Sequence, residues 1–199
     1  AAIIAKAMGL PLSIKARGSD ISYWGEQGFA RQQMVDAAKA ATGLLAVSHD
    51  LAGQMAVMGM EAGKITVHYT GLDRDRFRPL EHTQLRSQLS RELGFALPDN
   101  APLIACIGAL IERKGQGIAI TALNDIPGAR LVLVGKGDDE ARLRALAVSE
   151  GVETRVFFAG SVDHDLMPLI LSAADVMVLP TAAEGLANAW VEALACGTP

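Results

Sequence analysis

The sequence predicts an α/β protein in which parallel strands alternate with helices. Short apolar runs rich in Val, Ile and Leu alternate with helix-like segments along the 199 residues, which is typical of parallel sheets covered by helices. Hydrophobic residues make up 50% of the chain but aromatic residues only 5%, and this mixture suits buried parallel strands better than a β-sandwich. The sequence contains no internal repeat of solenoid length, so a repeat architecture is not expected.

The first part of the chain shows this alternation as far as residue 80. We expect helices over residues 1–8, 27–42 and 50–58, and strands over residues 12–16, 44–47 and 65–69. Ser48 is placed to cap the third helix, because its hydroxyl can accept a hydrogen bond from a free backbone N–H group. Residues 17–20 are predicted to form a loop at the carboxyl end of the first strand, and residues 77–79 to begin a linker.

The second part of the chain shows the same alternation more clearly. We expect helices over residues 83–93, 115–123, 138–150, 165–173 and 187–195, and strands over residues 103–107, 130–134, 155–158 and 176–179. Two such units, residues 1–80 and 81–199, are the simplest division of the chain. Ligands of open α/β sheets bind beyond the carboxyl ends of the strands, so the loops after these strands are where we expect functional residues.

Composition excludes several classes of function. The 18 basic and 22 acidic residues give a formal net charge of −4, and without a long basic run nucleic acid is not an expected partner. The longest uncharged apolar run, residues 103–111, is too short to span a membrane. Cys106 and Cys196 lie in apolar surroundings, which predicts buried, reduced thiols and a reducing compartment such as the cytoplasm. His49 and His68 have no ligand partners at metal-binding spacing, so no metal site is predicted.

Two loops carry the residue types that bind anions and flat rings. In the loop after residue 107, Gly108 allows close approach of the backbone, and Arg113 and Lys114 directly precede a predicted helix. Cations beside a helix N-terminus suit a phosphate group, although solvated loop charges explain the pair equally simply. In the loop after residue 158, Gly160 and Val162 are candidates for the wall of a base-binding site, with an ordinary turn as the alternative.

The segment Gly135-Lys136-Gly137 is not predicted to bind a dinucleotide. Glu140 occupies the place of the third glycine of the dinucleotide fingerprint, and the neighbouring Asp138 and Asp139 would repel a pyrophosphate. These two aspartates are instead expected to lie at the N-terminus of the following helix.

The last sixteen residues, 184–199, carry the most specific pattern, EGLANAWVEALACGTP. Gly185 permits a tight turn, and Asn188 can cap the next helix, whose first N–H groups would face an anion. Glu184 can accept hydrogen bonds from two sugar hydroxyls. Glu192 lies in an apolar segment, four residues after Asn188 and so on the same face. We expect this helix to be buried, with an exposed polar strip at Glu192 as the alternative.

The same residues resemble a known family. Glu184 and Glu192 at this spacing, followed by ALACGTP, together with Gly108 and Lys114-Gly115, are similar to the donor-site motifs of the retaining group 1 glycosyltransferases, also called family 4. The resemblance extends over nearly the whole chain. It implies the GT-B fold, an α/β fold of two Rossmann-like parallel-sheet domains. Residues 1–80 would be the C-terminal half of the acceptor-side domain, and residues 81–199 a nucleotide-sugar domain truncated at its end. Both domains are expected to be incomplete in this chain.

The resemblance also implies roles for individual residues. Lys114 would bind the donor diphosphate, Glu184 the hydroxyls of the transferred sugar and Glu192 those of the ribose, so that Glu184 and Lys114 are the implied catalytic residues. The remaining implied donor-binding residues are Gly108, Arg113, Gly160, Val162, Gly185, Leu186, Ala187 and Asn188. Arg17 and Asp20 are acceptor-side candidates. The family often has His at the position of Arg17 and usually has Arg at that of Ala109, so these two positions depart from its pattern.

The implied activity is transfer of a hexosyl unit, with retention, from a UDP-, GDP- or ADP-linked sugar to a carbohydrate or glycolipid acceptor. No metal or other cofactor is expected, because protein cations and helix ends can stabilise the departing diphosphate. We expect these 199 residues alone to be inactive. The alternatives are a non-catalytic nucleotide-sugar-binding module, favoured by Ala109, and a sugar-nucleotide epimerase. Peripheral contact with the inner membrane face is left open, since many relatives modify lipid carriers.

Overall fold

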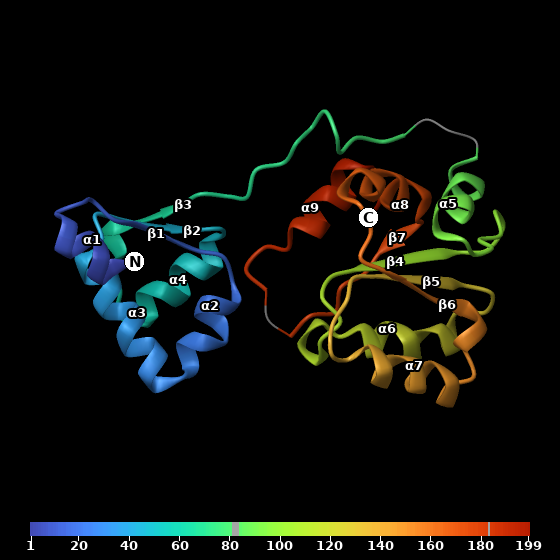
Figure 1. The fold of residues 1–199 in the computed structure, drawn as a ribbon, viewed down its shortest axis with the longest axis horizontal. Coiled ribbons are helices and arrows are strands. Elements are labelled where there is room, and N and C mark those ends of the chain that lie inside the picture. Colours follow the sequence, from blue (N-terminus) through green and yellow to red (C-terminus); the bar gives the residue numbers. More distant parts are fainter. Residues whose placement is uncertain (81–83, 183) are drawn as a thin grey trace. The chain divides into compact units, whose positions relative to one another are not determined.

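The structure is a computed structural model that describes residues 1–80, 84–182 and 184–199. Contacts divide the chain into two compact units. Unit 1 comprises Ala1–Gly71 and the short segment Ala183–Ala187, and unit 2 comprises Leu72–Ala182 and Asn188–Pro199. Each unit contains one parallel sheet with helices (Figure 1), so the predicted alternation of strands and helices is confirmed.

Unit 1 is built around a three-stranded parallel sheet. Its strands lie in the order β1-β2-β3, with Ser13 of β1 opposite Gly43 of β2, and Leu44 of β2 opposite Ile65 of β3. In chain order the elements are α1 (Ala2–Met8), β1 (Ser13–Ala16), α2 (Ser19–Ser22), η1 (Trp24–Glu26), α3 (Gly28–Ala40), β2 (Gly43–Ala46), α4 (His49–Val57), η2 (Ala62–Lys64) and β3 (Ile65–Val67).

Local chemistry explains where these elements begin. The Ser48 hydroxyl accepts a hydrogen bond from the Leu51 N–H group at 3.1 Å, so the predicted cap of α4 is confirmed. Residues 17–20 were predicted as a loop, but α2 begins at Ser19. The Asp20 carboxylate accepts the N–H groups of Arg17 and Gly18 at 3.0 and 2.7 Å, and these bonds turn the chain directly into a short helix.

Unit 2 is built around a four-stranded parallel sheet in the order β6-β5-β4-β7. In Figure 1, α6 and α7 cover one face of this sheet, and α5, α8 and α9 lie on the other. In chain order the elements are α5 (Leu85–Leu93), β4 (Leu103–Ile107), η3 (Glu112–Lys114), α6 (Gln116–Ala122), η4 (Leu123–Asp125), β5 (Arg130–Val134), α7 (Glu140–Ser149), η5 (Glu153–Arg155), β6 (Val156–Gly160), η6 (His164–Leu166), α8 (Met167–Ala173), β7 (Val176–Met177) and α9 (Asn188–Ala195).

The strand order of unit 2 contains a topological switch. From β4 the chain builds β5 and β6 on one side, and it then returns to add β7 on the other side of β4. All five residues of β4 are buried, as expected for a central strand covered on both faces. Ligand sites of such sheets lie where the strand order reverses, so the loops that follow β4 and β7 are the place to look for function.

Several elements differ from the sequence prediction. Strand β7 pairs only through Val176 and Met177 and ends before the predicted Leu179, while α8 begins at Met167 after the 3-10 turn η6 rather than at Asp165. The helix expected to be buried, α9, buries only Ala193 fully, and its Leu194 is 68% exposed. The predicted start of α5, Thr83, lies outside the described residues. The predicted domain boundary between residues 80 and 81 adjoins the same gap and stays a prediction.

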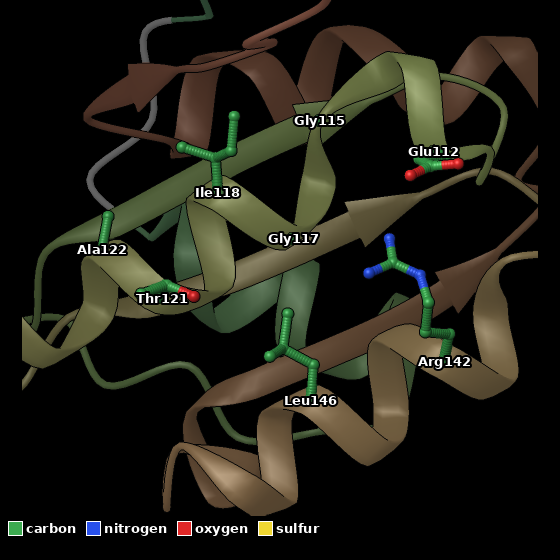
Figure 2. Close-up of a pocket in the computed structure, with 8 residues that line it drawn as sticks. All are labelled: Glu112, Gly115, Gly117, Ile118, Thr121, Ala122, Arg142 and Leu146. Carbon is green, nitrogen blue, oxygen red and sulfur yellow. The ribbon is translucent and has the colours of Figure 1, made fainter.

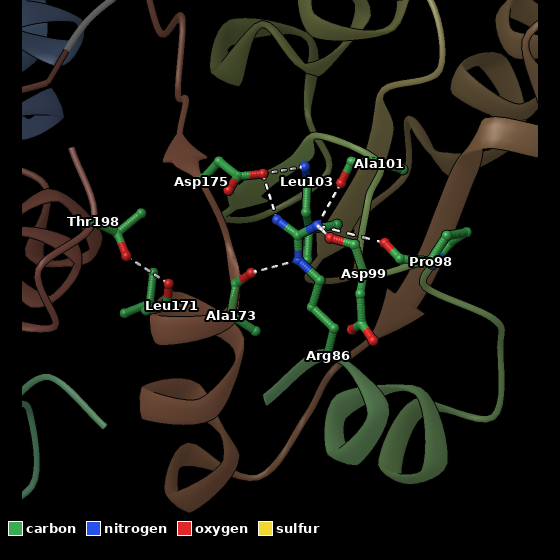
Figure 3. A network of polar contacts seen from close by, with 9 residues as sticks. All are labelled: Arg86, Pro98, Asp99, Ala101, Leu103, Leu171, Ala173, Asp175 and Thr198. Atoms are coloured by element: carbon green, nitrogen blue, oxygen red, sulfur yellow. Dashed lines mark hydrogen bonds and ion pairs between the residues drawn. The ribbon is translucent and has the colours of Figure 1, made fainter. Parts of the chain in front are cut away.

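Arg86 forms hydrogen bonds that connect α5 with the end of α8 and with the segment before β7. The Arg86 guanidinium, on α5, donates hydrogen bonds to the Asp175 carboxylate before β7 and to the carbonyl at the end of α8 (Figure 3). The Asp175 carboxylate also accepts the Leu103 N–H group at the start of β4, at 2.7 Å. The further acceptors are the carbonyls of Pro98, Asp99 and Ala101. Because the Arg86 side chain is only 13% exposed, most of its donors must find partners within the protein.

Candidate functional site

The loops that follow β4 and β7 pack directly against each other in unit 2. The Arg113 carbonyl accepts hydrogen bonds from the Ala182 N–H group at 2.9 Å and from the Thr181 hydroxyl at 3.2 Å. Gly115 has a positive φ of 72°, and a Cβ atom there would lie 2.1 Å from the Pro180 carbonyl oxygen. Only glycine fits this conformation and this close approach. The sequence predicted both loops as functional, but nothing in it indicated that they touch.

Lys114 lies beside Gly108, as the two implied phosphate-binding residues would have to. A Cβ atom built on Gly108 would lie 3.8 and 3.9 Å from Cδ and Cε of Lys114. The lysine stem therefore runs along the glycine at the carboxyl end of β4. Lys114 belongs to the 3-10 turn η3, which is followed by the N-terminus of α6. This end of unit 2 thus combines a cation with helical N–H groups, which suits an anionic ligand.

The pKa of Cys106, on β4, depends on its burial and on the charge of Lys114. Burial raises the pKa of its thiol to about 12, and the positive charge of Lys114 opposes that rise only in part. Both cysteines are free and buried, which confirms the sequence prediction of reduced, buried thiols.

We therefore expect Cys106 to stay unmodified by iodoacetamide at pH 8 in the folded protein and to react once the protein is unfolded, as mass spectrometry would show. Only the thiolate is nucleophilic. Because the folded pKa is raised, the neutral thiol contributes stability below the ordinary thiol pKa. That contribution is lost as the pH rises toward about 12. Rapid alkylation of the native protein at pH 8 would contradict this assignment.

Gln116 is a buried polar residue that the sequence analysis did not single out. It is the first residue of α6, is 1% exposed, and its Nε2 donates to the Ala109 carbonyl at 2.9 Å. The Leu110 N–H group in turn donates to the Lys136 carbonyl at 3.0 Å. These bonds fix the loop that begins at Gly108. The sequence places a polar residue directly after Lys114-Gly115, but it does not show that this side chain points into the protein.

Of the two implied base-binding residues, Gly160 ends β6 and Val162 follows it, and β6 is separated from β4 by β5. The Gly160 carbonyl accepts the Gly135 N–H group at 2.8 Å, and a Cβ atom at Gly160 would lie 3.7 Å from Cε of Lys136. Lys136 therefore adds a second cationic stem to the carboxyl edge of the sheet. The sequence analysis singled out Gly160 from the turn pattern around it, and it did not predict that Lys136 lies beside this glycine.

Glu192 is largely covered on α9. Its side chain is 14% exposed, and its Oε1 lies 3.7 Å from Nε2 of His164. This exposure disfavours the alternative of an exposed polar strip. Asn188 is the first residue of α9, rather than the capping residue before the helix as predicted.

The remaining predicted residues lie in unit 1. A Cβ atom at Gly185 would lie 2.7 Å from the Arg17 carbonyl oxygen, and Leu186 packs against the core of the unit. Arg17 and Asp20, the acceptor-side candidates, thus lie in the same unit as residues 184–187. The Asp20 carboxylate already accepts hydrogen bonds from backbone N–H groups, so it stabilises the start of α2.

A surface groove lies between α6 and α7 (Figure 2), with a volume of about 580 Å³. Ile118 of α6 and Leu146 of α7 give it an apolar floor, while Glu112 and Arg142 lie at one end. The hydrogen bonds that Arg142 donates to the Asp139 carboxylate raise the pKa of the guanidinium, and the negative charge of Glu112 adds to this effect. Of the implied donor-binding residues, none lines this groove.

The described part of the chain contains neither a metal-binding cluster nor a helix that could cross a membrane. Among residues 1–80, 84–182 and 184–199, no group of three or more His, Cys, Asp or Glu side chains could hold a metal ion. Within the same ranges, no helix has the length and apolarity needed to cross a membrane.

Comparison with known families decides which family these loops represent. The family model of the group 1 glycosyl transferases matches residues 93–199, which is more than half of the chain. The chain belongs to this family. The match includes Gly108, Lys114, Glu184 and Glu192, so the resemblance noted from the sequence is confirmed.

Two curated proteins illustrate the sequences that this chain is similar to. A GDP-mannose-dependent monoacylated alpha-(1-6)-phosphatidylinositol monomannoside mannosyltransferase of Corynebacterium glutamicum is 36% identical over 141 residues, which cover 65% of this chain and 36% of that protein. A D-inositol 3-phosphate glycosyltransferase of Mycobacterium bovis is 31% identical over 174 residues, covering 84% of this chain and 34% of that protein. The chain thus spans about a third of the length of these relatives.

Solved structures that resemble this chain show the same fold. Anabaena Alr3699/HepE in complex with UDP and glucose matches with a TM-score of 0.88 and 27% identity, covering 100% of this chain and 54% of that one. A sucrose-phosphate synthase from Thermosynechococcus elongatus matches with a TM-score of 0.77 and 26% identity, covering 91% of this chain and 46% of that one. These matches and the two parallel sheets confirm the predicted GT-B type of fold.

Proposed function

We propose that the whole protein is a retaining glycosyltransferase that moves a hexosyl unit from a nucleotide-diphosphate sugar to a hydroxyl of an acceptor. The observation that carries the proposal is the position of Lys114. Its stem runs along Gly108 at the carboxyl end of β4, which is the strand where the strand order of the sheet reverses. Both residues lie in the part of the chain that matches the group 1 family. A cation at this place can stabilise the negative charge that develops on the departing diphosphate.

Each residue of the implied site has a place in this proposal. Lys114, with Gly108 and Arg113 in the same loop, would bind the diphosphate. The backbone of residues 185–188 would hold the phosphates and the transferred sugar, and Glu184 would orient that sugar through its hydroxyls. Glu192 would accept the ribose hydroxyls, and Gly160 and Val162 would flank the base. This set needs no metal ion, because Lys114 and helix N-termini supply the positive potential.

The relatives suggest the kinds of donor and acceptor to test. The Corynebacterium relative is named as GDP-mannose-dependent and as acting on a phosphatidylinositol mannoside, and the Anabaena structure contains UDP and glucose. We therefore favour UDP-, GDP- or ADP-linked hexoses as donors, and a glycolipid or soluble carbohydrate as acceptor, with Arg17 and Asp20 on the acceptor side. A glycolipid acceptor would bring a cytoplasmic protein to the inner membrane face.

The proposal is tested by incubating the whole protein with UDP-glucose, GDP-mannose and ADP-glucose, each with and without a panel of carbohydrate and glycolipid acceptors. We expect acceptor-dependent release of nucleoside diphosphate and, by NMR, a product with the anomeric configuration of the donor. Conversion of the donor sugar without any acceptor would indicate an epimerase instead. A rise in melting temperature with nucleotide, but no turnover with any acceptor, would favour the non-catalytic module that Ala109 makes worth testing.

A further inference from the structure

Side chains from three parts of unit 2 form a polar chain that ends at Glu192. Arg76, in the segment before α5, contacts η6 twice. Its Nη2 lies 2.9 Å from Oδ1 of Asp165, and its Nη1 lies 2.8 Å from Nδ1 of His164. On the other side of the imidazole ring, Nε2 of His164 lies 3.7 Å from Oε1 of Glu192 on α9. Apart from Glu192, none of these residues has a role in the site described above.

The contact with Arg76 determines which nitrogen of His164 carries the proton. A guanidinium group has only donors, so Nδ1 of His164 must accept the hydrogen bond from Arg76. A neutral imidazole that accepts at Nδ1 carries its proton on Nε2. The nitrogen that faces Glu192 therefore presents an N–H group to the carboxylate.

Phe77 and Glu192 are the covered members of this arrangement, whereas the side chains of Arg76 and His164 are 40% and 56% exposed. Phe77 is 3% exposed and meets the His164 ring edge-on, with the ring centroids 5.3 Å apart, so the ring is supported from one side. Glu192 is 14% exposed, so few water molecules compete for its oxygens. At 3.7 Å the contact is an electrostatic attraction rather than a direct hydrogen bond. It favours one orientation of the carboxylate about its terminal bond.

We propose that Arg76 and His164 are positioning residues that orient the Glu192 carboxylate for the ribose hydroxyls of the nucleotide. This inference rests on the proposed function, in which Glu192 binds the ribose. An acceptor group that already points in the binding direction loses less freedom when the ligand arrives. The chain Arg76–His164–Glu192 therefore contributes to nucleotide affinity without touching the nucleotide, through the tautomer of His164 and the orientation of Glu192.

The test is a comparison of two ligands on matched variants of the whole protein. Calorimetry with UDP, GDP and ADP identifies the nucleoside diphosphate that binds most tightly, and its 2′,3′-dideoxy analogue serves as the ligand without ribose hydroxyls. We expect His164→Leu and Arg76→Gln to weaken binding of the ribonucleotide by about three- to tenfold, and to leave binding of the analogue unchanged. His164→Gln keeps most of the affinity, because an amide N–H can face Glu192. Arg91→Gln removes an exposed arginine of α5 and is the control.

The outcomes separate this inference from the proposed function. If Glu192→Gln weakens both ligands equally, or neither, the ribose role of Glu192 is wrong. If Glu192→Gln affects only the ribonucleotide but His164→Leu and Arg76→Gln affect both ligands alike, or neither, the positioning role is overturned. A general structural defect would lower affinity for both ligands, so the analogue detects it. If His164→Leu does not fold, Arg76→Gln still gives the comparison of the two ligands, with His164→Gln as the variant expected to keep most of the affinity.

Discussion

Replacing Lys114 with Ala is expected to lower kcat/KM for the donor by about ten- to a hundredfold in the whole protein. A charge-assisted hydrogen bond contributes about 1.5–3 kcal/mol, and each 1.36 kcal/mol corresponds to about a factor of ten. Lys114 lies near the carboxyl end of β4, where its stem runs along Gly108. Steady-state kinetics with varied donor concentration measures the effect.

Two further variants make this result specific. Lys114→Arg keeps the charge and is expected to recover part of the activity, because a planar guanidinium does not reproduce the compact ammonium. Lys39→Ala removes a lysine from an exposed ion pair with Asp36 in unit 1 and should leave kcat/KM unchanged. If Lys114→Ala stays within about twofold of the original protein, when one charge-assisted hydrogen bond predicts at least tenfold, the phosphate-binding role is wrong.

Replacing Arg86 with Leu is expected to lower the free energy of unfolding of unit 2 by about 3 kcal/mol. The guanidinium is 13% exposed and donates to Asp175 and to carbonyls in two separate segments. Removing it leaves several carbonyls with fewer partners and detaches α5 from the starts of β4 and β7. For a domain of this size, such a loss lowers the melting temperature by roughly 10–15 °C, which calorimetry or circular dichroism would show.

The neighbouring arginine on the same helix is the matched control for this experiment. Arg91 is an exposed residue in the last turn of α5, and Arg91→Leu is expected to shift the melting temperature by less than about 2 °C, since exposed substitutions usually change stability by at most about 0.5 kcal/mol. Arg86→Lys should recover only part of the loss, because one ammonium cannot reach acceptors that surround a planar group. Equal shifts for Arg86→Leu and Arg91→Leu would show that the network adds nothing beyond helix propensity.

The sequence was most informative where burial is uniform. Strands β4 and β5 have the predicted bounds, because the runs LIACI and RLVLV are apolar at nearly every position and are buried in a sheet covered on both faces. The cap at Ser48 was also predictable, since its hydrogen bond reaches only three residues along the chain. Local chemistry and unbroken apolar runs therefore gave the correct elements.

What the sequence could not predict depends on contacts between distant segments. The apolar residues of α9 suggested a buried helix, yet Leu194 is 68% exposed, because composition does not say which face has a neighbour. The apolar run at residues 176–179 suggested a longer strand, but pairing of β7 with β4 stops at Met177. His164 and Glu192 are 28 positions apart in the printed numbering, and their contact follows from the placement of η6 beside α9.

The close contact at Gly115 has a mechanical consequence. Because a side chain at this position would run into the Pro180 carbonyl, and because the Arg113 carbonyl is bonded to Thr181 and Ala182, the loops after β4 and β7 cannot shift independently. A change at Pro180 is passed through the backbone to Lys114, one residue before the contact. Exchanging one of these loops for that of a relative would therefore misplace the lysine, and grafting a new specificity onto this unit requires both loops to be transplanted as a pair.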